Sequence, residues 1–112
     1  MEPLDWNALR ENCAGDEGLV NEVLDLFRGE ADGLVTDVGK AISAGDALAV
    51  KRAAHRLKGA LVSLGARPAT EGARALEACG GAGDLAPARA LYETLEHEMT
   101  RLIRAISLPV AA

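Results

Sequence analysis

The chain has 112 residues, a formal net charge of −5 and 49% hydrophobic residues. This length corresponds to one domain, which buries roughly two-thirds of its unfolded surface around a single core. The acidic balance argues against a general nucleic-acid binder, because such proteins carry a basic face. No apolar run approaches the roughly 18 residues of a membrane-spanning helix, and the N-terminus lacks a signal-peptide pattern. We therefore expect no nucleic-acid and no membrane partner.

The composition favours helices and a reducing compartment. Only 3% of the residues are aromatic, and an aliphatic, alanine-rich sequence with few β-branched runs is typical of helices rather than strands. The two cysteines, Cys13 and Cys79, form neither a CxxC pair nor a metal-ligand spacing. We expect both thiols to be reduced and partly buried, which predicts a cytoplasmic protein that has no metal site.

The first part of the chain predicts a short helix over 5–13 and a long helix over 16–44. The short helix is expected to cover one end of a bundle, with Trp6 as its anchor. The long helix follows Asp16, a favourable N-cap residue, and its apolar positions recur at steps of three and four residues. Glycines weaken its middle, so a bend or a break is expected within 29–33.

Three further helices are expected over 46–64, 68–80 and 84–107. Asp46 is a favourable N-cap for the first of them and Asp84 for the last. Each of the last two helices also carries a proline in its first turn, where proline is tolerated. Four amphipathic helices with short connections predict an all-α fold, namely an up-down-up-down antiparallel four-helix bundle with the short N-terminal helix capping one end.

The helix over 46–64 presents a histidine away from its apolar stripe. At about 100° per residue, Leu57 falls within the stripe and His55 lies nearly opposite. Lys58 and Gly59 follow His55 by three and four residues and share its face. A glycine inside a helix costs about 1 kcal/mol relative to alanine, and this one leaves bare backbone beside the imidazole. The combination suggests a histidine that carries a phosphoryl group and hands it to another protein.

The residues HRLKG at 55–59, with LG at 64–65 closing the helix, resemble the signature of histidine phosphotransfer (HPt) domains. These domains are the intermediate carriers of multistep two-component phosphorelays. The resemblance covers about 5–106 and implies one HPt-like domain over 1–112. It implies that His55 accepts a phosphoryl group from a receiver-domain aspartate and passes it to another receiver. The implied partners are response-regulator receiver domains and a sensor or hybrid histidine kinase.

The resemblance also suggests roles for the neighbours of the histidine. The far ring nitrogen of His55, Nε2, would carry the phosphate, with Lys58 as charge partner and Gly59 giving the receiver access. Glu77 matches the position from which many HPt domains bond the near ring nitrogen, although a solvated glutamate near Arg74 is an equal alternative. The implied Mg²⁺ belongs to the receiver, so this chain is expected to bind no cofactor and to act as a monomer. No glycine-rich phosphate loop is present, and no autokinase activity is expected.

Three residues around the histidine are candidates for partner docking. Leu48 and Val62 fall on the His55 side of the helix, and exposed apolar residues there would let a receiver dock. Lys51 is a second candidate cation on this side. The alternatives are scattered surface aliphatics and a solvated lysine.

Other classes of protein stay open. A degenerate HPt domain or a helical adaptor would bind receiver or kinase domains without carrying phosphate. Metal-binding bundles use Glu-x-x-His motifs, which this sequence lacks. In the phosphoacceptor helix pair of sensor kinases an acidic residue usually follows the histidine, whereas Arg56 follows here. The second histidine, His97, has acidic neighbours and is predicted to be a surface residue paired with Glu93.

Overall fold

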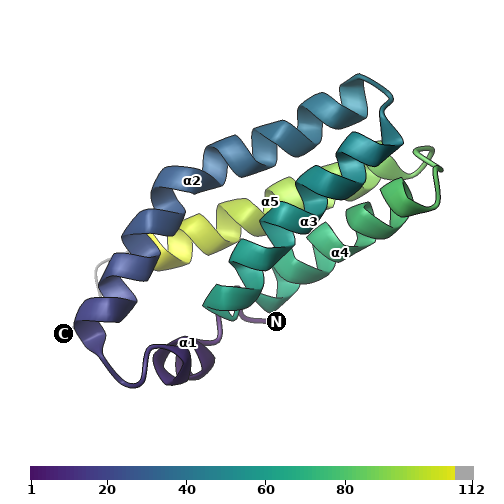
Figure 1. Ribbon diagram of the computed structural model, residues 1–112. Helices are drawn as coiled ribbons and strands as arrows, with labels where there is room; N and C mark the ends of the chain where they lie inside the picture. Colours follow the sequence, from purple (N-terminus) through teal and green to yellow (C-terminus); the bar gives the residue numbers. More distant parts are fainter. Residues whose placement is uncertain (108–112) are drawn as a thin grey trace.

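The computed structural model describes residues 1–107, which form five α-helices and no strand. These are α1 (Trp6–Asn12), α2 (Glu17–Ser43), α3 (Ala47–Leu64), α4 (Arg67–Gly81) and α5 (Ala88–Ser107). The four long helices run alternately up and down, and each packs against the next, with α5 closing the bundle against α2 (Figure 1). The predicted all-α, up-down-up-down bundle is confirmed.

Aspartate side chains begin three of the helices at the predicted places. Asp5, Asp16 and Asp46 precede α1, α2 and α3, and each carboxylate accepts a hydrogen bond from a backbone N–H of the first turn. The donors are Ala8 (3.0 Å), Leu19 (3.1 Å) and Ala49 (3.0 Å). These bonds satisfy N–H groups that a helix start leaves unpaired. Gly65 ends α3 in the left-handed conformation, at φ 76°.

The helix α2 is uninterrupted from Glu17 to Ser43, so it does not break at 29–33. Phe27, Ala31 and Val38 on its inner face are buried in the core. We infer that this packing outweighs the low helix propensity of the glycines between them, because tertiary contacts supply most of the stability of a helix in a folded protein.

The last helix begins at Ala88, not at 84 as predicted. Asp84 caps a turn instead: its carboxylate accepts a hydrogen bond from the Ala86 N–H at 3.1 Å. The Ala88 N–H then donates to the carbonyl of Leu85 at 3.1 Å. The residue before a proline is disfavoured in the helical conformation, which explains why the helix does not extend back through Ala86.

The helix α4 extends one residue beyond the predicted 68–80 at each end. Gly80 therefore lies inside α4 instead of ending it. A Cβ atom placed on Gly80 would lie 2.6 Å from both the Ala47 carbonyl oxygen and the Lys51 nitrogen. Glycine at this position lets the backbones of α3 and α4 touch, which is a role the sequence pattern did not reveal.

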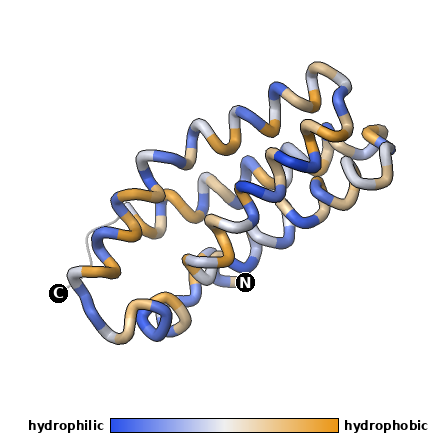
Figure 2. The backbone as a smooth tube through the Cα atoms, viewed as in Figure 1, coloured by the Kyte–Doolittle hydropathy of each residue, from blue (hydrophilic) through white to orange (hydrophobic). Residues whose placement is uncertain are grey.

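The core lies between the four long helices, and α1 covers one end (Figure 1). Hydrophobic and hydrophilic residues alternate in short runs along each long helix, as expected for helices with one buried face (Figure 2). The largest fully buried side chains are Leu9, Val38, Val50, Leu57, Leu61, Leu64, Leu76, Leu95 and Leu102. Over the described residues, no helix has the length and apolarity needed to cross a membrane.

The N-terminal cap is anchored differently from the prediction. Leu4 and Leu9 are buried, whereas Trp6, the expected anchor, is only partly buried. The Asp5 N–H also donates to the carbonyl of Gly65 at 2.9 Å, which ties the N-terminal segment to the end of α3. Leu9, three residues after Trp6, is the residue of α1 that is fully buried in the core.

Tyr92 on α5 lies over Gly39 on α2. Its hydroxyl donates to the carbonyl of Val35 at 3.0 Å, and a Cβ atom on Gly39 would lie 2.6 Å from that hydroxyl oxygen. We predict that Gly39→Ala costs about 1–2 kcal/mol of unfolding free energy, because it displaces the tyrosine. In a Tyr92→Leu background the same change should stabilise by about 0.5–1 kcal/mol. A double-mutant cycle by urea denaturation tests this coupling between Gly39 and Tyr92. An equal loss of unfolding free energy on Gly39→Ala in both backgrounds would contradict it.

Candidate functional site

His55 lies on the solvent side of α3, where its side chain is 69% exposed. The opposite face of the helix holds this orientation, since Val50, Leu57 and Leu61 are fully buried against the neighbouring helices. Ala54 is also fully buried, so the buried arc of α3 is wider than the predicted stripe. The core therefore fixes the backbone beneath His55 while leaving the imidazole in solvent.

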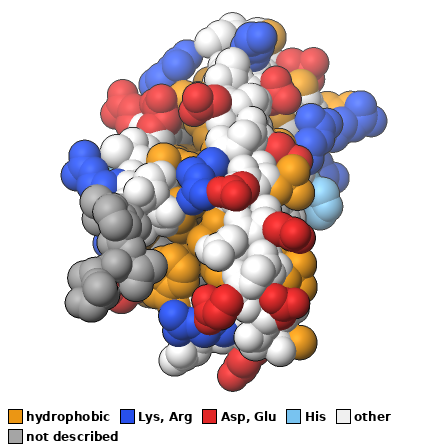
Figure 3. Space-filling model, turned by 90° about the vertical axis from the view of Figure 1, so that its left-hand side faces the viewer, with side chains coloured by type: hydrophobic (Ala, Val, Ile, Leu, Met, Phe, Trp, Pro, Cys, Tyr) orange, Lys and Arg blue, Asp and Glu red, His pale blue; other side chains and the backbone are white. Residues whose placement is uncertain are grey.

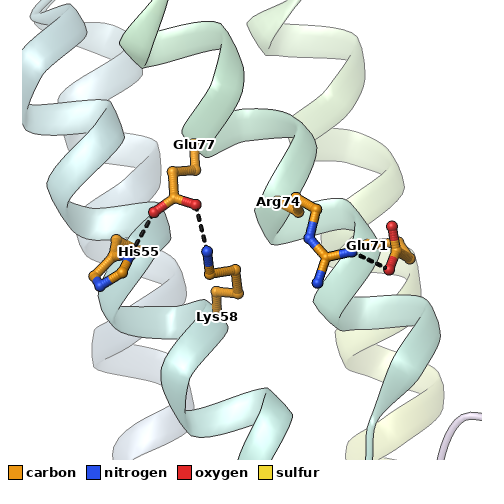
Figure 4. A network of polar contacts seen from close by, with 5 residues as sticks. All are labelled: His55, Lys58, Glu71, Arg74 and Glu77. Atoms are coloured by element: carbon orange, nitrogen blue, oxygen red, sulfur yellow. Dashed lines mark hydrogen bonds and ion pairs between the residues drawn. The ribbon is translucent and has the colours of Figure 1, made fainter.

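Glu77 on α4 connects His55 and Lys58 on α3 (Figure 4). Its Oε2 contacts the Nδ1 atom of His55, and its Oε1 accepts a hydrogen bond from the Lys58 ammonium at 2.6 Å. The side chains of Glu77 and Lys58 are only 19% and 23% exposed. Arg74, the other predicted neighbour of Glu77, pairs with Glu71 at 2.8 Å. The packing of α3 against α4 thus brings together three of the candidate residues.

The two hydrogen bonds fix the charge of this carboxylate. The hydrogen bond from Lys58, followed by that from His55, holds the pKa of Glu77 below its ordinary value, although partial burial acts in the opposite direction. An ionised carboxylate only accepts hydrogen bonds, so Nδ1 of a neutral His55 is the protonated ring nitrogen. The Nε2 atom then keeps its lone pair and faces away from Glu77 (Figure 4).

The lowered pKa of Glu77 predicts a pH-dependent contribution to stability. A carboxyl whose pKa is lower in the folded protein than in the unfolded chain stabilises the fold above the unfolded value, and this stabilisation is lost as the pH falls through the folded value. Wild type should therefore exceed Glu77→Gln in unfolding free energy at neutral pH, by a margin that shrinks below pH 4.5, the ordinary value. Urea denaturation at several pH values measures this difference in unfolding free energy, and Glu71→Gln is the control variant. A margin that persists in acid would refute this assignment.

Gly59 leaves open space beside the imidazole. It is exposed, and a Cβ atom placed there would meet nothing within 4 Å. Its carbonyl oxygen accepts a hydrogen bond from the Ser63 hydroxyl at 3.1 Å, so the helix is intact at this point. The fold itself therefore does not require glycine here, and the surface at this position is open.

The three docking candidates lie on the same side of α3 as His55. Leu48 and Val62 are each 53% exposed. They lie seven residues before and after His55, or about 10 Å from it along the helix axis in either direction. Lys51 is exposed and forms no ion pair within the described residues. Apolar side chains thus border both ends of the histidine face.

The second histidine and the Arg56 side chain do not belong to the group formed by His55, Lys58 and Glu77. His97 on α5 is exposed, and within residues 1–107 it pairs with neither Glu93 nor any other acid. Arg56 pairs with Asp37 of α2 at 3.6 Å, a contact with no sequence signal because it depends on how α2 packs against α3. Across the described residues, no three His, Cys, Asp or Glu side chains are grouped so as to hold a metal ion.

A helical bundle that presents one oriented and exposed histidine beside a lysine and an open glycine defines a class of protein, the phosphohistidine carriers. The Hpt domain family model matches residues 22–105. The crystal structure of histidine-containing phosphotransfer protein B (HptB) from Pseudomonas aeruginosa PAO1 superposes with a TM-score of 0.86 at 28% identity, covering 93% of this chain and 90% of that chain. No curated protein sequence matches significantly. The chain belongs to the Hpt domain family, and its function is histidine phosphotransfer in phosphorelays.

Proposed function

We propose that His55 is the phosphoacceptor, receiving the group from a receiver-domain aspartate and passing it to another receiver. The observation that carries this proposal is the His55–Glu77 contact, which leaves Nε2 free on an exposed ring. The Nε2 lone pair attacks the phosphorus of the aspartyl phosphate, the P–O bond to aspartate breaks, and the aspartate leaves as a carboxylate. The ring becomes positively charged while Nδ1 keeps its proton. The ionised Glu77 balances that charge, and the reverse step restores the starting state.

Lys58 and Gly59 act in the same transfer. In the unloaded protein the Lys58 ammonium is held by Glu77 at 2.6 Å, one helical turn after His55. Its flexible stem allows it to turn toward the phosphoryl oxygens once the group is on Nε2. Gly59 lets the receiver backbone approach the ring, because nothing lies within 4 Å of its Cβ position. Orientation, charge balance and access are therefore the contributions of this chain.

The receiver supplies the remaining parts in this proposal. It brings the acceptor aspartate and Mg²⁺, and transfer then depends mainly on positioning and charge balance. The protein acts as a monomer, with no cofactor of its own and no autokinase activity, between receiver domains and a sensor or hybrid kinase. A cytoplasmic location is supported by Cys13 and Cys79, which are both buried and unpaired.

The proposal is tested by incubating a phosphorylated receiver domain and Mg²⁺ with wild type, His55→Ala and His97→Ala. An acid-labile, base-stable phosphate is expected on wild type and His97→Ala and is expected to be absent from His55→Ala. His97 is a matched control because it is also an exposed helical histidine. If no receiver of a panel loads wild type, the chain instead binds receiver or kinase domains as an adaptor.

A further inference from the structure

The charges of the protein are divided unevenly between its helices. The helix α3 carries four of the twelve Lys and Arg residues and none of the seventeen Asp and Glu residues. Its cations are Lys51, Arg52, Arg56 and Lys58. In Figure 3, Lys and Arg side chains gather beside a histidine at the right-hand edge, whereas over the rest of that face they are interspersed with Asp and Glu. A protein that is acidic overall therefore bears one basic helix.

Only half of this basic set is neutralised within the bundle. Lys58 pairs with Glu77 at 2.6 Å and Arg56 pairs with Asp37 at 3.6 Å. Lys51 and Arg52 are exposed and form no ion pair in the part of the chain that the structure describes. Two adjacent cations without acidic partners thus lie on the most basic helix of the protein.

The free cations lie one helical turn before the histidine. Lys51 and Arg52 precede His55 by four and three residues, so all three share one face of α3. Leu48 precedes them by one further turn and is 53% exposed. We call Leu48, Lys51, Arg52 and His55 the basic stripe. Its unpaired cations lie only on the N-terminal side of His55, because Lys58 on the other side is paired with Glu77.

We propose that the basic stripe binds an acidic patch on the receiver domain and that this attraction sets the rate of association. The inference rests on the proposed function, because the bound protein is the one that reacts with His55. An acidic patch complements two cations for which residues 1–107 of this chain supply no acidic partner. Complementary charges raise association rates and suppress wrong partners more than they raise affinity.

The rest of the surface disfavours a nucleic acid or an anionic membrane as the occupant. The chain outside α3 contains all seventeen acidic residues but only eight basic ones. An extended polyanion would therefore be repelled by the surface on either side of the stripe. Asp46, which caps α3 five residues before Lys51, marks the acidic border of the stripe. Exposed Leu48 next to the cations suits a folded protein surface with an apolar contact beside its acids.

The test is charge reversal on the stripe against an identical charge change elsewhere. Lys51→Glu/Arg52→Glu is compared with Arg89→Glu/Arg104→Glu, whose arginines are exposed on α5, the helix diagonal to α3 in the bundle. The receiver that loads wild type fastest is the probe, at concentrations where transfer is second order. We expect the stripe variant to react about tenfold more slowly at low salt and the α5 variant to stay within about twofold of wild type. Raising the salt from about 20 to 300 mM should slow wild type and speed the stripe variant, because salt screens the attraction in the first and the repulsion between like charges in the second.

The other possible results separate a failure of the charge inference from a failure of the proposed function. Equal rates for the two variants, or a wild-type rate that does not respond to salt, would overturn the inference while leaving phosphotransfer at His55 intact. Failure of every receiver to load wild type would instead remove the proposed function. If the stripe variant does not fold by circular dichroism, Lys51→Gln/Arg52→Gln replaces it, with a smaller decrease expected. Tight binding of a DNA duplex or of anionic phosphatidylserine vesicles to the stripe would also overturn the proposal.

Discussion

Gly80→Ala is expected to destabilise the bundle by about 2 kcal/mol, even though alanine is the better helix former. The new Cβ atom would lie 2.6 Å from two backbone atoms of α3 and 3.0 Å from a third, the Lys51 Cα atom. Backbone cannot rotate away as a side chain can, so α3 and α4 must move apart. Overpacking of this kind typically costs about 1–3 kcal/mol.

The adjacent glycine gives a matched control. Gly81 is also in α4, but a Cβ atom there would meet only the Lys51 side chain, at 3.9 Å. Gly81→Ala should therefore be neutral or slightly stabilising in the same urea titration. Equal stabilities for Gly80→Ala and Gly81→Ala would contradict the close contact between α3 and α4. The contact also bears on the site, because Glu77 lies one turn before Gly80 and reaches His55 across the same interface.

Glu77→Ala should slow loading of His55 by about tenfold or more, by analogy with the loss seen when the hydrogen-bond partner that orients a metal-ligating histidine is removed. The change removes the acceptor for Nδ1, so the imidazole loses its fixed orientation and its preferred tautomer. It also leaves the Lys58 ammonium, only 23% exposed, without its carboxylate. The rate of phosphotransfer at a saturating concentration of phosphorylated receiver measures this effect, because binding of the receiver no longer limits the rate.

The control for this prediction is Glu71→Ala. Glu71 lies on the same helix and is also paired, with Arg74 at 2.8 Å, but this pair is exposed and does not reach His55. Exposed pairs contribute little, so this variant should load within about twofold of wild type. The loading rate of Glu77→Gln should fall between those of Glu77→Ala and Glu71→Ala, since the amide oxygen still accepts a hydrogen bond from Nδ1 but carries no charge. An unimpaired Glu77→Ala would exclude the positioning role.

The helical periodicity predicted the parts of the site that lie on one helix. The opposition of Leu57 and His55 and the shared face of Lys58 and Gly59 follow from about 100° per residue. Asp46 likewise marked the start of α3, because capping depends on residues only three apart in sequence. Local geometry alone decides these features.

The features that the sequence did not predict depend on contacts between helices. Whether Glu77 reaches His55 or Arg74 is decided by the approach of α4 to α3, which Gly80 permits. The pairing of Arg56 with Asp37 requires the register of α2 against α3. Neither register nor interhelical distance is encoded in a single-helix pattern, so sequence alone left Glu77 between two alternatives.

The most direct test of the central claim identifies the atom that carries the phosphate. The protein, labelled with ¹⁵N in histidine, is loaded by a phosphorylated receiver and examined by long-range ¹H–¹⁵N and ³¹P NMR. We predict phosphorus on Nε2 of His55 and a proton on Nδ1, since Glu77 accepts a hydrogen bond from that nitrogen. Phosphorus on Nδ1 of His55 would contradict the role of Glu77, and phosphorus on His97 or on no histidine would contradict the assignment of His55 as the carrier.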